Sequence, residues 1–305
     1  MHQPVLLREV IDALHIRGNG VYVDATIGRG GHSRALLEQL SVDGRLLLID
    51  RDPEAVRWAR EQFGGDRRVD IEQGNFVRLS EYLQRHRIVG RVDGLLFDLG
   101  VSSPQLDRPE RGFSFRKDAP LDMRMDPGTG YSAADWLAKA TESEMAEIFR
   151  RFGEERFARR IAHAICTARE HGRIERTAQL RDIVARAVPK WEKGKDPATR
   201  TFQAIRIHIN DELAALRQVL PQAVSALSPG GRLVVISFHS LEDRIVKRFM
   251  RDAARGDAFP SDVPIRGDAF KPQLRVIGKA VRPSADEISD NPRARSAVMR
   301  VAERT

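Results

Sequence analysis

Two acidic residues and a group of glycines occur at spacings that could bind a nucleotide-like cofactor. Asp24 ends the segment Val-Tyr-Val-Asp, which reads as a short strand. Three glycines follow it, Gly28, Gly30 and Gly31. Glycine permits positive φ angles and lets a ligand approach the backbone closely. Asp50 lies 22 residues beyond Gly28, which is the spacing expected of a carboxylate that binds ribose hydroxyl groups.

Two classes of cofactor fit these residues. The dinucleotide fingerprint is incomplete, because Ser33 occupies its third glycine position. Asp24 would also repel a pyrophosphate bound at the following helix, by about 1 kcal/mol or more. It would instead attract a cation such as the sulfonium of S-adenosylmethionine. The sequence therefore favours S-adenosylmethionine over NAD, and an NAD-dependent oxidoreductase is the alternative.

Expected strands and helices alternate over much of the chain. Apolar and β-branched runs predict strands at residues 21–24, 45–49, 69–72, 92–99, 232–238, 274–281 and 297–303. Helical periodicity predicts helices at residues 4–14, 33–40, 53–63, 76–88 and 240–250. The alternation predicts an α/β fold with a doubly wound sheet. Ligands of such sheets bind at the carboxyl ends of the strands, where Asp50, Asp98 and His239 would lie with the glycines.

A long helical segment interrupts this alternation. Residues 100–126 are polar and without periodicity, and loops of this length are usually functional. From residue 132 to about residue 188 the pattern is helical throughout. We therefore expect an all-helical domain inserted into one sheet domain. The expected ranges are 1–106 and 201–305 for the sheet domain, and 107–200 for the loop with the inserted, substrate-recognition domain.

The composition excludes several classes of protein. No apolar run approaches the ~20 residues that span a bilayer, and the first residues do not resemble a signal peptide, so we expect a cytoplasmic protein. The single cysteine, Cys166, excludes an intrachain disulfide and a thiolate zinc cluster, and we expect no metal site. Of the 51 basic side chains 43 are arginine. Arginine binds phosphate and stacks on bases, which suits RNA, although genome bias alone could produce this composition.

Several long segments together resemble the MraW family, the bacterial ribosomal small-subunit RNA cytosine-N4 methyltransferases. They include Glu-Arg-Gly-Phe-Ser-Phe at residues 110–115 and Asp-Leu-Gly-Val-Ser-Ser-Pro-Gln at residues 98–105. The other segments are residues 26–33, 120–126, 197–203, 236–249 and 291–296. Ile27 stands where the family has an aromatic residue, a departure that leaves the glycine pattern intact.

The resemblance implies a Rossmann-like class I methyltransferase sheet with an inserted helical domain, and S-adenosylmethionine as the cofactor. It implies cofactor contacts at Gly30, Gly31, His32, Asp50, Phe76, Asp98 and Gln105, to which the glycine turn itself adds Asp24 and Gly28. For Phe76 a structural position at the start of a helix is the alternative. The implied partner is 16S rRNA in the small ribosomal subunit, where a decoding-centre cytosine is methylated on its N4 amine.

Five arginines in the resembling segments are expected to contact this substrate. They are Arg111, Arg200, Arg244, Arg293 and Arg295. Removing a phosphate-binding arginine should flatten the salt dependence of RNA binding. The oligomeric state stays open, with a homodimer as one option.

Three residues are candidates for catalysis. The amine is a poor nucleophile, so an oxygen near it must stabilise the positive charge that grows on nitrogen. Asp98 and the backbone at Ser102 are the candidates, and cofactor binding alone is the alternative for Asp98. His239 could accept the departing proton or merely anchor the strand end. Cys166 lies within a helix, which disfavours attack on carbon 5 of the base. A non-catalytic RNA-binding assembly factor is the remaining alternative.

Overall fold

The chain folds into two compact units. The computed structural model describes residues 4–191, 194, 196–256 and 272–305. One unit comprises Met1–Gly100 and Leu213–Thr305, and the other is Val101–Glu212. The second unit is thus inserted in the sequence of the first. It begins six residues before the expected range 107–200 and ends twelve residues after it.

The first unit contains a seven-stranded sheet in the order β3-β2-β1-β4-β5-β7-β6. The strands are β1 (Val21–Asp24), β2 (Arg45–Asp50), β3 (Val69–Gln73), β4 (Val92–Asp98), β5 (Leu227–Ser237), β6 (Leu274–Val281) and β7 (Val298–Arg304). Strands β1 to β5 are parallel to one another, whereas β7 runs antiparallel to its two neighbours, β5 and β6. This topology confirms the predicted doubly wound α/β class.

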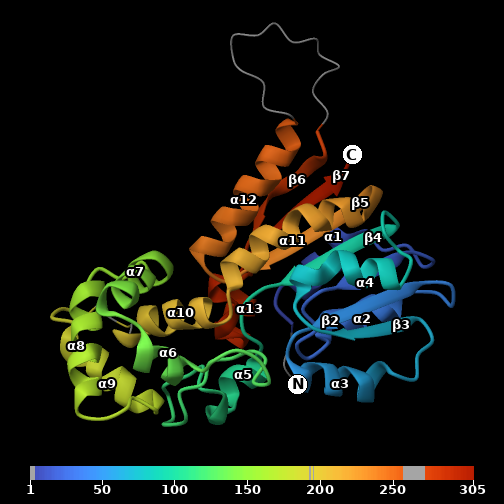
Figure 1. The fold of residues 1–305 in the computed structure, drawn as a ribbon. Helices are drawn as coiled ribbons and strands as arrows, with labels where there is room; N and C mark the ends of the chain where they lie inside the picture. The colour runs from blue at the N-terminus through green and yellow to red at the C-terminus, as the bar shows by residue number, and fades with distance from the viewer. Residues whose placement is uncertain (1–3, 192–193, 195, 257–271) are drawn as a thin grey trace, which may run out of the picture. The chain divides into compact units, whose positions relative to one another are not determined.

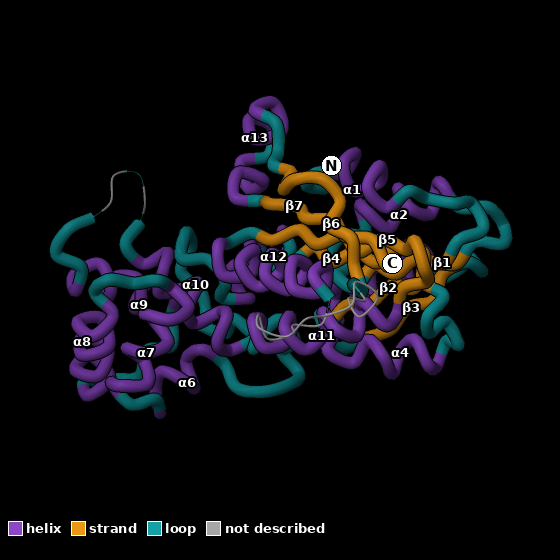
Figure 2. Tube along the Cα trace, turned by 90° about the horizontal axis from the view of Figure 1, so that it is seen from above, coloured by secondary structure: helices purple, strands orange, loops and turns teal. Residues whose placement is uncertain are grey.

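Helices cover both faces of this sheet (Figure 1). They are α1 (Leu7–Leu14), α2 (Gly31–Gln39), α3 (Pro53–Phe63), α4 (Leu79–Arg85), α11 (Glu212–Ala226), α12 (Ser240–Arg255) and α13 (Ala285–Asp290). Because successive strand residues point to opposite faces, Leu47 and Leu95 pack with α4 and α11, while Leu46 and Leu96 pack with α1 and α2. Figure 2 shows the two helical layers on either side of the strands.

Two local expectations for this unit were wrong. The segment 76–88 is not one helix, because Phe76–Arg78 is a 3₁₀ turn and α4 ends before Arg87, whose φ is +58°. The strand expected at residues 232–238 begins earlier, because β5 spans Leu227–Ser237. The pairing of β5 with β4 shifts register between Val92 and Gly94, and this irregularity accommodates the Pro-Gly-Gly sequence within the strand.

The second unit is helical around its own apolar core. Its helices are α5 (Ser103–Asp107), α6 (Ala133–Lys139), α7 (Glu142–Gly153), α8 (Ala158–Glu170), α9 (Thr177–Ala187) and α10 (Ala198–Ile209). Phe149, Ile161 and Leu180 meet in this core. The loop before α6 is attached by the buried amide of Asn210, which donates to the Met123 carbonyl oxygen at 2.7 Å. No helix in the described part of the chain is long and apolar enough to cross a membrane.

Candidate active site

The glycine turn connects the carboxyl end of β1 to the first turn of α2. Gly28 and Gly30 have φ angles of +53° and +60°, which other residues adopt only with strain. A Cβ atom on Gly30 would overlap the ring of Trp58, and one on Gly31 would overlap Pro4. The turn therefore requires glycine for both its backbone conformation and its packing, and it leaves the backbone open to a ligand.

We expect Gly30→Ala to cost more stability than a glycine-to-alanine change at an open turn. Gly90 is the matched control, because its φ is +68° and no heavy atom lies within 4 Å of its Cβ position. The strain of a positive φ costs about 1–2 kcal/mol at either site. Overpacking against Trp58 should add about 1–3 kcal/mol at Gly30 alone. Urea unfolding of both variants measures the difference, and equal losses would contradict this account of the turn.

Asp24 lies buried beneath the glycine turn. Its carboxylate accepts hydrogen bonds from the Ser33 hydroxyl at 2.6 Å and from the Thr26 amide at 3.1 Å. Burial raises the pKa of Asp24, and the Ser33 hydrogen bond opposes this effect. The structure thus gives Asp24 a role in holding β1 to α2, and its contact with a cofactor stays a prediction.

Asp50, at the end of β2, is brought directly onto the glycine turn. Its Oδ2 accepts from the Gly28 amide at 2.9 Å, and its Oδ1 accepts from the Asp52 amide at 2.9 Å. Burial raises the pKa of Asp50 to about 6, against the lowering effect of these two hydrogen bonds. A carboxylate has about four acceptor positions, so Asp50 retains capacity for ligand hydroxyl groups.

Asp98 ends β4, the strand beside β1. Its amide donates to the Thr26 hydroxyl at 2.7 Å, and its Oδ2 lies 3.6 Å from His32 Nδ1. Its Oδ1 is buried and has no hydrogen-bond partner among the described residues. Burial raises the pKa of Asp98 well above its ordinary value, and the charges of Asp24 and Glu242 raise it further. A buried, unpartnered carboxylate oxygen in such a position indicates a ligand site.

Phe76 follows β3 and is half-buried. Its ring packs edge-to-face on Phe97, with ring centroids 5.6 Å apart, and so contributes to the core. This contact is compatible with the expected structural role, and a contact with adenine stays a prediction.

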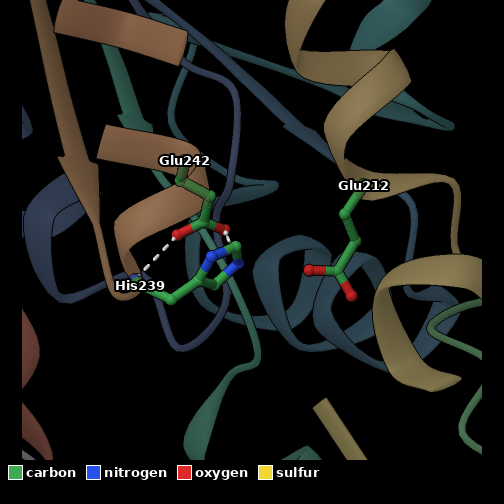
Figure 3. A group of neighbouring side chains, drawn as sticks. All are labelled: Glu212, His239 and Glu242. Carbon is green, nitrogen blue, oxygen red and sulfur yellow. Dashed lines mark hydrogen bonds and ion pairs between the residues drawn. The ribbon is translucent and has the colours of Figure 1, made fainter. Parts of the chain in front are cut away.

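His239 and Glu242 form a pair where β5 leads into α12 (Figure 3). The Glu242 carboxylate is buried and accepts from the backbone amides of Phe238 at 2.8 Å and His239 at 3.3 Å. The His239 Nε2 lies 3.2 Å from Glu242 Oε1. Inspection of the sequence singled out His239 but missed Glu242. The sequence feature that could have revealed Glu242 is its position three residues after the residue that caps a helix, which is typical of a capping box.

Four predicted site residues belong to the second unit. The Ser102 amide donates to the Gln105 side chain at 2.9 Å, so this pair caps α5. The Arg111 side chain is buried, and its guanidinium donates to the backbone carbonyl of Met125 at 2.9 Å. This placement gives Arg111 a structural role in its loop and offers no support for an RNA contact. Arg200 is half-buried on α10.

The other three predicted arginines lie exposed on the first unit. Arg244 is on α12, while Arg293 and Arg295 are on the 3₁₀ turn Pro292–Ser296. Exposed arginines are accessible to phosphate, and their contact with RNA stays a prediction.

Comparison with known proteins identifies the family of this chain. The model of the MraW methylase family matches residues 1–305. A ribosomal RNA small subunit methyltransferase H from Thioalkalivibrio sulfidiphilus is 57% identical over 99% of this chain and 97% of its own length. The protein of the same name from Nitrosococcus oceani is 55% identical over 99% of this chain and 96% of its own length.

Among solved structures, an rRNA methylase from Streptococcus thermophilus matches 100% of this chain and 98% of its own, with 10% identity and a TM-score of 0.44. The family match spans the whole sequence, and relatives above 50% identity cover nearly all of it. The family match confirms the predicted family, and it confirms S-adenosylmethionine as the cofactor. The chain therefore belongs to the MraW methylase family.

Proposed function

We propose that this chain methylates ribosomal RNA of the small ribosomal subunit, on the N4 amine of a cytosine in the decoding centre of 16S rRNA. The observation that carries the proposal is the buried Oδ1 of Asp98, which has no hydrogen-bond partner in the described part of the chain and lies at the end of the strand next to β1. The names of the relatives support an rRNA substrate, and so does the net charge of +8.

The residues of the first unit fit the cofactor. The turn from Gly28 to Gly31 offers open backbone, Asp50 offers acceptors for ribose hydroxyl groups, and Asp98 offers a carboxylate to a cation. When bound, S-adenosylmethionine supplies an electrophilic methyl group on a positively charged sulfur. Asp98 then has two functions, which are to bind a cation and to face the reacting amine.

The chain must also activate the amine. The lone pair of an exocyclic amine is delocalised into the base, so the nitrogen is a poor nucleophile. The protein must hold it in line with the methyl group. The carboxylate of Asp98 stabilises the positive charge that develops on nitrogen, and His239 accepts the departing proton. We further propose that the helical unit Val101–Glu212, including Ser102, contributes to recognition of the RNA.

We expect the binding of S-adenosylmethionine to weaken as the pH falls through the range in which Asp50 titrates. The pKa of Asp50 is raised to about 6, so the carboxyl is ionised at pH 7 and protonated at pH 5. Protonation turns one acceptor oxygen into a donor and removes a hydrogen bond to the ribose. The dissociation constant should rise about tenfold per pH unit below this value. Calorimetry from pH 5 to 8 measures the dissociation constant. In Asp50→Asn the constant should no longer rise as the pH falls through the range in which Asp50 titrates.

One experiment tests the proposed function directly. Small subunits that lack the modification are incubated with the protein and radiolabelled S-adenosylmethionine, and the rRNA is then digested to nucleosides. We expect label in N4-methylcytidine, and naked 16S rRNA in a parallel reaction shows whether the assembled subunit is needed. Label in 5-methylcytidine would overturn the assignment of the amine. RNA binding without any transfer would favour an assembly factor, and saturation by NADH would favour an oxidoreductase.

A further inference from the structure

His32 lies buried between the N-terminal segment and the carboxyl end of β4. Its Nε2 is 3.0 Å from the carbonyl oxygen of Val5, and its Nδ1 is 3.6 Å from Oδ2 of Asp98. The His32 side chain is only 6% exposed, so water has little access to either nitrogen. Each ring nitrogen therefore faces one protein oxygen.

The Val5 contact decides which ring nitrogen carries a hydrogen. A carbonyl oxygen can only accept, so the Nε2–H group of His32 must donate to it. In a neutral imidazole the Nδ1 atom then carries a lone pair, and this lone pair faces Oδ2 of Asp98. Two acceptors repel each other at this distance. A proton on either group removes the repulsion, so the pair retains one dissociable proton.

The surroundings favour the proton on Asp98. Burial lowers the pKa of His32, although the charge of Asp24 on β1 opposes this effect. Burial raises the pKa of Asp98, and Asp24 and Glu242 on α12 add their negative charges. Asp50 at the end of β2 is a further carboxylate near Asp24. No cation contributes to the pKa of Asp98 in the part of the chain that the structure describes.

We propose that His32 is a positioning residue. Its Nδ1 lone pair faces Oδ2 of Asp98 and keeps Asp98 as a neutral carboxylic acid in the free protein, and this proton is released when the positively charged methyl donor binds. The O–H bond of Asp98 breaks, its electron pair stays on Oδ2, and the proton passes to the buffer. It does not remain on His32, because a nearby cation disfavours an imidazolium. The inference rests on the proposed function, since it requires the donor to bind beside Asp98.

The state of His32 can be measured without any cofactor. Nitrogen-15 NMR of the free protein distinguishes the two neutral tautomers of an imidazole from its charged form. At pH 7 we expect His32 in the neutral form with hydrogen on Nε2. A charged ring, or hydrogen on Nδ1, would overturn the proposal, and this measurement needs no variant that could fail to fold.

The released proton can be counted by calorimetry. S-adenosylmethionine is titrated at pH 7 into the protein in two buffers with different heats of ionisation. We expect about one proton released per donor bound, and an affinity that rises about tenfold per pH unit near pH 7. At this pH Asp50 is already largely ionised, because its pKa is about 6. Asp98→Asn should abolish the release, because an amide has no proton to lose in this range.

Two histidine variants complete the test. His32→Gln places an amide N–H donor where Nδ1 was. This donor stabilises the ionised form of Asp98 in the free protein, so the number of protons released per donor bound should fall below about half. His15→Asn is the matched control, because His15 is exposed in the same unit, and it should release as much as the wild type. Binding without proton release would overturn this inference and leave the proposed function intact. Absence of donor binding, with the protein folded, would instead overturn the proposed function.

Discussion

Replacing Asp98 with alanine is expected to lower the rate of rRNA methylation by about 10²–10³-fold. In the proposed mechanism the carboxylate stabilises charge on the attacking nitrogen, and its buried Oδ1 has no hydrogen-bond partner among the described residues. The measurement is single-turnover methyl transfer to unmodified small subunits at saturating S-adenosylmethionine. Saturation separates the chemical step from any loss of cofactor affinity, which calorimetry measures independently.

The control for Asp98→Ala is Asp70→Ala. Asp70 lies on β3, and its carboxylate pairs with Arg45 at 2.9 Å, away from the glycine turn. Loss of an exposed pair costs at most about 1 kcal/mol of stability, so this variant should transfer methyl groups at the wild-type rate. If Asp98→Ala bound the cofactor weakly but reacted at a near-normal rate once saturated, Asp98 would be a binding residue alone.

His239→Gln is expected to lower the rate of methyl transfer by about 10²-fold or more, because it removes the proposed proton acceptor. The Nε2 of His239 lies 3.2 Å from the buried Glu242 carboxylate, and neither ring nitrogen has a hydrogen-bond partner within the described ranges. Because Glu242 lies beside Nε2, Nδ1 is the nitrogen that is left to face a substrate. Methyl transfer measured from pH 5.5 to 8.5 tests this role.

Glu242→Gln is the companion variant. It keeps the imidazole but removes the negative charge beside it, so it should lower the rate of methyl transfer if Glu242 positions His239 for proton transfer. The amide oxygen of glutamine can still accept from the Phe238 amide, which preserves the start of α12. An unchanged pH–rate profile in His239→Gln would assign both residues to the structure of this helix end rather than to proton transfer.

Local patterns in the sequence were enough for most of the elements. The continuous apolar run at Leu46, Leu47 and Leu48 predicts a buried strand, and the structure directs successive side chains to opposite cores. The glycine turn could be predicted because positive φ angles need glycine. The end of the helix that follows Phe76 could not be predicted from the sequence, because it depends on the positive φ angle of one residue, Arg87.

Polar residues were harder to assign than apolar ones. The structure gives Arg111, whose RNA contact stays a prediction, a structural role that the sequence did not reveal, because its guanidinium donates to backbone carbonyls within its own loop. An arginine on a surface and a buried arginine look alike in a sequence, because the difference depends on which carbonyl groups the fold leaves unpaired. Glu242 was missed for a related reason, since its partners are backbone amides at a strand end.

By itself the sequence determined the α/β class, the glycine turn and the two carboxylates Asp24 and Asp50, because periodicity, φ preference and spacing are properties of neighbouring residues. Only the tertiary structure decided which carboxylates are satisfied within the protein and which can still bind a ligand. Asp24 is satisfied by Ser33 inside the turn, while Oδ1 of Asp98 lacks a partner among the described residues. Only the tertiary structure placed the Val5 carbonyl on His32 as well. Burial and hydrogen bonding between distant segments set the charge of each group, and no local pattern encodes them.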